Sequence, residues 1–373
     1  MKRVQYIGCL FLVAVLCSGL FPPATKACTT FCLFHGQEKI FGRNYDYGIG
    51  FGLVLVNKRQ VTKSAMPEPP VNVLHWTSKY GSVTFNQFGR DFPMGGINEA
   101  GLVVELMALD ATVYPAADSR PALDCLEWIQ YQLDNFASVK EILQRASEVR
   151  IASSVGCHYL IADRNGETAS LEYLGGQLVT HTGEALPVKT LTNSTYAESV
   201  EHLKKHQGFG GSAPISSSLR SLDRFARASA LVKNYQPTPG QSVIDYAFGI
   251  LKSVSEPAHT KWSIVYDLKK MDVYFRTSRA ARVRQFNLKS FDFSCASPVK
   301  MLDVNADLEG DVAASFTAYT LAANRKLIES SFSGVNFLRN VPASEREAIA
   351  RQPEKGSCQS LLMDKASSPR IKK

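Results

Sequence analysis

Residues 24–34 are ATKACTTFCLF, and residues 42–46 are GRNYD. A run of β-forming residues begins at Cys28, and a turn pattern separates it from the second segment. We therefore expect an antiparallel strand pair whose first strand begins at Cys28. In such a pair Arg43 and Asp46 return to the beginning of the first strand. The sequence thus predicts a cysteine, an arginine and a carboxylate together at one end of a two-stranded unit.

The segment before this cysteine, residues 1–27, has the layout of a secretory signal peptide. Lys2 and Arg3 form a positive start, an apolar run extends to Phe21, and small residues lead up to Ala27. The apolar run is shorter than the roughly 20 residues that span a bilayer. We expect cleavage after Ala27 and export to the periplasm or the medium, with no stable membrane insertion of the mature chain.

Cleavage at this junction would make Cys28 the first residue of the mature protein. Lipid attachment at Cys28, or at Cys17, is the alternative reading of a cysteine in such a place. The charged Lys26 beside the junction fits a lipid-attachment site poorly. The sequence therefore favours a free N-terminal cysteine over a lipid-anchored or secreted binding protein.

Length and composition set the broad class of the protein. The chain has 373 residues, of which 45% are hydrophobic and 20% charged, so it can bury a sizeable core. The formal net charge of +8 is spread along the chain without a dense basic stripe, and we expect no nucleic-acid partner. The eight cysteines include no CxxC pair, which excludes a zinc ribbon or a thioredoxin motif.

The order of elements predicts an α+β fold, with one domain over residues 28–341 and a polar, flexible tail over 342–373. Turn signals and capping boxes separate the elements, and no Gly- or Ser-rich linker divides the domain. Further strands are expected at residues 53–56, 83–85, 102–107, 158–161, 169–173, 263–266 and 271–275. Helices are expected from residue 121, at 138–146, from residue 195, and at 219–234, 242–253 and 311–328.

An N-terminal cysteine carries its own catalytic base. A thiol is a nucleophile only as its thiolate, and an α-amino group, with a pKa of about 8, can accept the proton. A nearby arginine favours the thiolate, and a nearby carboxylate can orient the terminal ammonium. Taken alone, Arg43 and Asp46 also fit an ordinary ion pair, and their position relative to Cys28 is what favours a catalytic role.

These residues and four later segments resemble the choloylglycine hydrolase family. That family is the bile salt hydrolase and penicillin V acylase group of linear amide C–N hydrolases, within the N-terminal nucleophile hydrolases. Besides the first two segments, the similar stretches are, in order, GINEAGL (96–102), the hairpin from His158 to Tyr173, LTNS (191–194) and LDRFARA (222–228). In the third of these, Thr195 follows where the family has proline.

The resemblance implies a four-layer αββα sandwich of two stacked, largely antiparallel sheets flanked by helices. It implies that Cys28 is the nucleophile, with its α-amine as base, and that Arg43 and Asp46 hold the thiol and the amine. Asn193 would donate its side-chain amide to the oxyanion, and Arg224 would complete the charged cluster. The reaction would cleave a linear amide through a thioester on the cysteine.

The two proposed oxyanion donors, Asn193 and a further residue at position 108, need separate comment. The family's further oxyanion donor falls on Ala108, where the family usually has Asn or Tyr, so that only the backbone N–H of Ala108 could serve. Asn193 lies in Asn193-Ser194-Thr195, which is also a glycosylation sequon and directly precedes a helix cap.

The resemblance implies no metal or organic cofactor and a small-molecule amide as partner, and it is compatible with a homo-oligomer, a tetramer as in the family. Conjugated bile salts, penicillin V, N-acyl homoserine lactones and other N-acyl amines stay open as substrates. The GFGG stretch at 208–211 lacks the lysine of a P-loop and is expected to be a flexible loop near the site. Cys32 is expected to be a small buried residue, and the sequence does not show which of the cysteines 32, 125, 157, 295 and 358 form disulfides.

Overall fold

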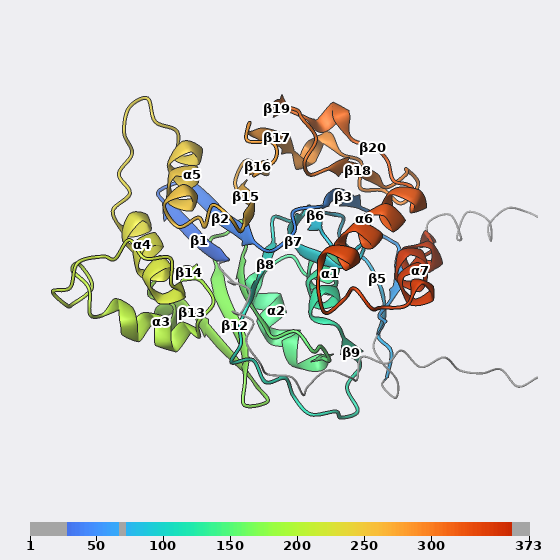
Figure 1. Cartoon of the computed structure of the whole chain (residues 1–373), viewed down its shortest axis with the longest axis horizontal. Coiled ribbons are helices and arrows are strands. Elements are labelled where there is room, and N and C mark those ends of the chain that lie inside the picture. Colours follow the sequence, from blue (N-terminus) through green and yellow to red (C-terminus); the bar gives the residue numbers. More distant parts are fainter. Residues whose placement is uncertain (1–27, 67–71, 360–373) are drawn as a thin grey trace, which may run out of the picture.

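The computed structural model describes residues 28–66 and 72–359, and the predicted signal peptide, 1–27, lies outside the described residues. Two sheets stack on each other and helices cover their outer faces (Figure 1). The predicted α+β sandwich is confirmed. Within the described ranges, no helix combines the length and apolar content needed to cross a bilayer.

The first sheet contains the strand pair on which the sequence analysis rests. β1 pairs antiparallel with β2, with Thr30 opposite Arg43 and Thr29 opposite Asn44. Gly42 lies opposite Phe31, and a Cβ at Gly42 would meet the Phe31 ring at 2.3 Å, so only glycine leaves room for that ring. In spatial order the strands are β14 (Thr190–Leu191), β1 (Thr29–His35), β2 (Glu38–Asp46), β15 (Thr260–Asp267), β16 (Asp272–Thr277), β17 (Arg284–Asn287) and β19 (Gly310–Asp311).

The second sheet has nine strands and faces the first. All of its neighbouring strands pair antiparallel. In spatial order they are β13 (Gln177–Thr182), β12 (Thr168–Leu174), β11 (Cys157–Ala162), β8 (Val103–Ala108), β7 (Pro93–Asn98), β6 (Ser82–Asn86), β3 (Leu53–Asn57), β18 (Lys300–Asp303) and β20 (Thr317–Ala318). Two short pairs complete the strands: β4 (Thr62–Ser64) with β5 (His75–Thr77), and β9 (Ala122–Leu123) with β10 (Arg150–Ile151).

The two faces of β1 explain the layers. Cys32 packs into the core between the sheets, as expected for a small buried residue, whereas Phe31 and Leu33 point to the other side and pack against α4 and α5. Alternate side chains of a strand point to opposite faces, so one strand supplies both interfaces. The helices are α1 (Cys125–Asn135), α2 (Val139–Arg145), α3 (Tyr196–Leu203), α4 (Ser221–Lys233), α5 (Val243–Ser253), α6 (Leu321–Gly334) and α7 (Ala343–Arg351).

Helix starts follow the capping signals. Asp124 caps α1 in a capping box with Glu127, so this helix begins at Cys125, later than the expected residue 121, and residues 122–123 are a strand instead. The predicted box of Thr195 and Glu198 is confirmed at the start of α3. These local hydrogen bonds satisfy backbone N–H groups that the first turn of a helix leaves without partners.

The prediction of a helix over residues 311–328 is wrong in its first half. Residues 310–318 form β19, a short 3-10 turn and β20, and α6 begins only at Leu321, after Thr320 accepts a hydrogen bond from the backbone N–H of Ala323. The ring of Phe316 packs against Phe286 and Phe291, with ring centroids 5.5 and 4.8 Å apart. This aromatic cluster holds the segment in a non-helical path.

The segment expected to be a loose tail from residue 342 contains α7, and its described part extends to residue 359. Ala350 is buried against α6, and the guanidinium of Arg325 binds Glu347 at 2.7 and 2.5 Å. A disulfide joins Cys295 to Cys358. The polar composition that suggested a tail belongs to the exposed face of a packed helix. The boundary at residue 341 stays a prediction.

Removing this disulfide is expected to lower the free energy of unfolding by about 2–4 kcal/mol, because the bond closes a long loop in the unfolded chain. Cys295 and Cys358 are 63 residues apart in the sequence. Urea titration of the oxidised protein and of Cys358→Ser measures the difference. The same comparison after reduction is the control, where the two curves should coincide. Equal stability of the oxidised proteins would contradict the expectation.

Candidate active site

Arg43 is fully buried between the two sheets and binds the second sheet. Its guanidinium donates to the carbonyl oxygens of Met94 at 2.6 Å and Leu106 at 3.0 Å and forms an ion pair with Glu105. The Tyr266 hydroxyl donates to the other oxygen of Glu105 at 2.5 Å. Pairing of this kind offsets the cost of burying a charge. Arg43 therefore pairs with Glu105 rather than with Asp46.

Cys28 is the first residue that the structure describes, and it is buried, with 4% of its surface exposed. Its sulfur lies 3.7 Å from the backbone carbonyl oxygen of Asp46. Burial raises the pKa of the Cys28 thiol, the Asp46 carboxylate raises it further, and the charges of Arg43 and Arg224 lower it. With this balance the thiol keeps its proton until a base removes it.

Asp46 ends β2 beside Cys28, and few hydrogen bonds offset the burial of its carboxylate. Both of its oxygens are buried without a well-formed hydrogen bond among the described residues. Burial raises the pKa of Asp46 to about 7, although the nearby Thr260 hydroxyl and the charge of Arg224 lower it in part. A buried carboxylate in this state is a ready partner for a cation or a hydrogen-bond donor.

Arg224 of α4 connects Cys28 to Asn193. Its guanidinium donates to the Cys28 carbonyl oxygen at 2.8 Å, to the Thr29 hydroxyl at 2.6 Å and to the Asn193 side-chain oxygen at 2.8 Å. Since the oxygen of the Asn193 amide is held by Arg224, its nitrogen is fixed as the donor end. The neighbouring Arg227 instead donates to the carbonyl oxygens of Ser216 and Ser218, away from this cluster.

Further residues that the sequence analysis did not single out hold the loop of Asn193. The Ser221 hydroxyl, at the start of α4, accepts from the Asn193 backbone N–H at 2.9 Å. His158 donates from Nε2 to the Thr192 carbonyl oxygen at 2.7 Å, and its Nδ1 lies 3.0 Å from the Glu172 carboxylate. His158 and Glu172 lie on the β11–β12 hairpin. This hairpin thus supports the loop that carries Asn193 and does not contact the Cys28 thiol.

Ala108 lies at the end of β8 and contacts Asn193 through its backbone. Its carbonyl oxygen accepts from the Asn193 side-chain nitrogen at 2.9 Å. Ala108 is paired with Cys157 of β11, and the next residue, Leu109, donates to the Gly156 carbonyl oxygen. Hydrogen-bonded and non-hydrogen-bonded pairs alternate along an antiparallel ladder, so both backbone groups of Ala108 face away from β11. Its N–H therefore points to the same side as the Asn193 amide.

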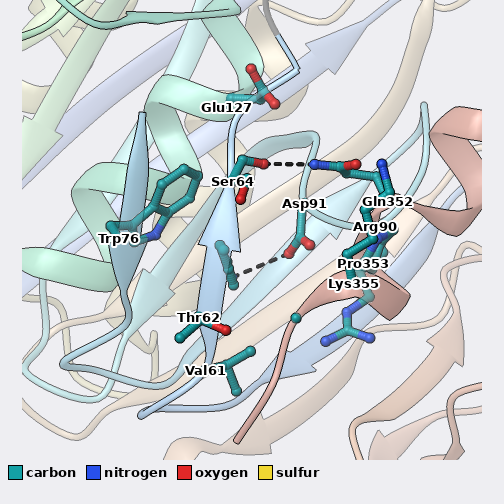
Figure 2. Close-up of a pocket in the computed structure, with 12 residues that line it drawn as sticks. Val61, Thr62, Ser64, Trp76, Arg90, Asp91, Glu127, Gln352, Pro353 and Lys355 are labelled. Atoms are coloured by element: carbon teal, nitrogen blue, oxygen red, sulfur yellow. Dashed lines mark hydrogen bonds and ion pairs between the residues drawn. The ribbon is translucent and has the colours of Figure 1, made fainter. Parts of the chain in front are cut away.

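Five of the six residues expected at the site thus converge on the end of β1: Cys28, Arg43, Asp46, Asn193 and Arg224. The sixth, Ala108, joins them through its backbone. A separate pocket lies elsewhere, between β4–β5 and the segment after α7 (Figure 2). There Lys63 binds Asp91 at 3.2 Å, and none of the lining residues belongs to the Cys28 cluster.

The stacked sheets, with a buried cysteine at the start of a central strand and an asparagine amide linked to it through Arg224, have the fold of the N-terminal nucleophile hydrolases. The family model of linear amide C–N hydrolases, choloylglycine hydrolase family, matches residues 28–301. The chain belongs to this family, and it is a hydrolase that acts on linear amide C–N bonds.

Individual relatives agree with this assignment. Penicillin V acylase of Pectobacterium atrosepticum is 30% identical over 263 residues, which is 59% of this chain and 69% of that protein. The structure of penicillin V acylase from Agrobacterium tumefaciens matches with a TM-score of 0.69 and 28% identity, over 79% of this chain and 98% of that one. A variant of conjugated bile acid hydrolase from Clostridium perfringens shares the fold, with a TM-score of 0.62 and 19% identity over 76% and 98%.

Proposed function

We propose that the mature protein begins at Cys28 and hydrolyses its amide substrate through a thioester on this residue. The observation that carries the proposal is the buried Asp46 carboxylate near Cys28, for which residues 28–66 and 72–359 supply no well-formed hydrogen bond. Cleavage after Ala27 would create a terminal ammonium on Cys28. The Asp46 carboxylate, which is close enough to Cys28 to raise the pKa of its thiol, would bind that ammonium. Arg43 and Arg224 would favour the thiolate electrostatically.

In the proposed reaction the α-amine takes the thiol proton, and the sulfur attacks the amide carbonyl carbon. The C–N bond breaks as the leaving amine receives that proton, and the acyl group stays on Cys28 as a thioester. Water, deprotonated by the α-amine, then attacks the thioester carbon and releases the acid and the free thiol. The Cys28 carbonyl oxygen stays bound to Arg224 at 2.8 Å, which holds the residue during both steps.

The oxyanion formed in both steps needs fixed donors. The Asn193 amide nitrogen carries two hydrogens and donates one of them to Ala108 within the described residues. We assign its second hydrogen and the backbone N–H of Ala108 as the oxyanion donors, because the contact with the Ala108 carbonyl oxygen holds the amide nitrogen beside that backbone. The loss of the family's usual Asn or Tyr side chain at Ala108 leaves this backbone role intact.

The names of the similar proteins favour penicillin V as the first substrate to test, because the relatives at 30% and 28% identity are both penicillin V acylases. A panel of penicillin V, glycine- and taurine-conjugated bile salts, N-acyl homoserine lactones and simple N-acyl amines, assayed for released amine, tests the choice. We expect the highest kcat/KM for penicillin V. If the protein hydrolysed only another member of the panel, the substrate assignment would change to that compound, and the proposed mechanism would be unaffected.

Export is the second part of the proposal. Intact-mass measurement of the protein recovered from the periplasm or the medium should give a chain that begins at Cys28. A diacylglycerol adduct, or retained residues before Cys28, would overturn the N-terminal nucleophile. Light scattering of the same sample determines the assembly state, for which a homo-tetramer is proposed from the family resemblance.

Asp46→Asn is expected to shift the pH dependence of kcat/KM. A carboxylate beside the terminal ammonium favours the protonated amine, so its removal lowers the pKa of that amine. The acidic limb of the profile should move to lower pH, and activity at neutral pH should fall by about tenfold or less as the amine loses its orientation. Profiles of the wild type and the variant measure this, with melting temperature as the control for folding. A shift to higher pH would contradict it.

A further inference from the structure

We propose that His202, His206 and Asp223 form a binding site for a divalent transition-metal ion, of the zinc type, that joins α3 to α4. The resemblance implies no metal, but the fold brings three metal-binding side chains together: His202 on α3, His206 in the turn after α3, and Asp223 on α4. Figure 1 shows α3 and α4 side by side. The site lies outside the Cys28 cluster, and its test does not depend on the proposed reaction.

The distances fit one metal ion. Nε2 of His202 lies 3.1 Å from Nε2 of His206 and 3.4 Å from Oδ1 of Asp223, and the three ligand atoms all lie within 4.8 Å of one another. A tetrahedral zinc ion, with bonds of about 2.0–2.1 Å, places neighbouring ligand atoms about 3.3 Å apart. Two of the three separations therefore already have the spacing of ligands on a shared ion.

The orientation of His206 gives independent support. Its Nδ1 lies 3.0 Å from the Pro214 carbonyl oxygen, which can only accept, so Nδ1 carries the hydrogen. In the neutral ring the lone pair then lies on Nε2, the atom that faces His202. A backbone carbonyl that fixes the far nitrogen in this way is the usual support of a metal-binding histidine.

The Gly-rich turn after His206 maintains this contact. Residues 208–211 loop the chain round so that Ala213 pairs with His206 in a parallel bridge. Gly208 has a φ of +82°, and a Cβ at Gly211 would lie 2.1 Å from the Lys205 carbonyl oxygen. The turn that the sequence suggested as a flexible loop is therefore a tight one, and it carries the Pro214 carbonyl oxygen back to the histidine.

A simple hydrogen-bond chain explains the cluster less completely. If His206 presents a lone pair, one Nε2 hydrogen of His202 would have to serve both that nitrogen and the Asp223 carboxylate. A divalent ion accepts all three lone pairs at once and compensates the carboxylate charge. Arg220 reaches only the other oxygen of Asp223, at 3.7 Å, and its side chain is 88% exposed.

The ion would act next to the proposed oxyanion donor. Asp223 directly precedes Arg224, whose guanidinium holds Asn193, and α3 begins three residues after Asn193. A metal bridge between these helices would hold both ends of that contact in place. The proposed role is thus a structural tie that supports the site without touching the substrate.

Thermal unfolding with added zinc or with a chelator tests the site. The protein carries Cys28→Ser, so that zinc cannot act through the N-terminal thiol. We expect zinc at roughly a hundred times its Kd to raise the Tm by about 4 °C. His206→Gln and Asp223→Asn should remove this shift, whereas His75→Gln should retain it, because His75 is an exposed histidine on β5 that contacts Ser64.

Cobalt substitution identifies the ligands. Bound cobalt should show visible bands of nitrogen and oxygen ligation without a thiolate charge-transfer band, and His206→Gln should lose them. No zinc-dependent shift at millimolar metal, a shift that survives both His206→Gln and Asp223→Asn, or a thiolate band would each overturn the proposal. If the two variants melt earlier but zinc shifts neither them nor the parent protein, the cluster is a hydrogen-bond network and the metal site is refuted.

Discussion

Replacing Cys28 by alanine is expected to lower kcat for amide hydrolysis by at least about 10⁴-fold, with the fold unchanged. The variant removes the Cys28 sulfur, which lies near Asp46 and Arg224, and no thioester can then form. Cys28→Ser should behave similarly, because a hydroxyl is a far weaker acid than a thiol. Single-turnover assays of released amine measure the loss, and circular dichroism and melting temperature report on folding.

Cys32→Ala is the matched control. Cys32 lies on the same strand and is buried in the same core, but its environment differs: burial raises the pKa of its thiol to about 12, and it lies close to Thr168. This variant should keep most of the activity and lose some stability through the small cavity. Near-wild-type turnover by Cys28→Ala, or a larger catalytic loss in Cys32→Ala, would refute the assignment of the nucleophile.

Asn193→Ala is expected to lower kcat by about 10²–10³-fold while KM changes little, as for the loss of one oxyanion donor. The side-chain nitrogen of Asn193 is the donor end of an amide whose oxygen is held by Arg224. Its donor hydrogens would act on charge that develops only in the transition state. Steady-state kinetics on the amide that the panel identifies give kcat and KM separately.

Two variants distinguish donation from packing. Asn193→Asp keeps the shape and an oxygen for Arg224 but removes the donors, and it should lose at least as much activity as Asn193→Ala. Ser194→Ala removes only a neighbouring hydroxyl that bonds to Ser221 at 2.9 Å, and it should stay within a few-fold of wild type. If Asn193→Asp retained the activity of the wild type, the oxyanion role would be wrong.

The strand pair at the start of the domain could be predicted because its signals are local. The turn between the two strands and the alternation along β1 fix the register that places Thr30 opposite Arg43. The segment before α6 could not, because Phe316 is held by Phe286 and Phe291, which lie on other elements. A helical spacing of apolar residues does not distinguish such a cluster from a helix face.

In the candidate site, too, some features could be predicted from the sequence and others could not. The order of short motifs around Cys28 predicted that Asn193 and Arg224 lie near it, and Arg224 does contact both Cys28 and Asn193, although they come from different parts of the chain. The partner of Arg43 was missed, because Glu105 becomes its neighbour only when the two sheets stack. Its one signal in the sequence was a charged residue inside the apolar run LVVELM. Position 95 must also be glycine, because a Cβ there would lie 1.9 Å from the Glu105 carboxylate. This requirement depends on the folded structure and leaves no local signal in the sequence.

The hydrogen bond from Arg224 to the Cys28 carbonyl oxygen joins residues that are 196 positions apart in the sequence. A chain end is ordinarily the part of a protein that frays first. Here a helix from the distant half of the domain would immobilise that end, so the entropy of ordering the reactive group is lost once, at folding, and not in every turnover. Local opening of α3 and α4 would therefore free the terminus and switch off hydrolysis while the two sheets are still intact. The working lifetime of the enzyme would then depend on the stability of these two helices and not only on that of its core.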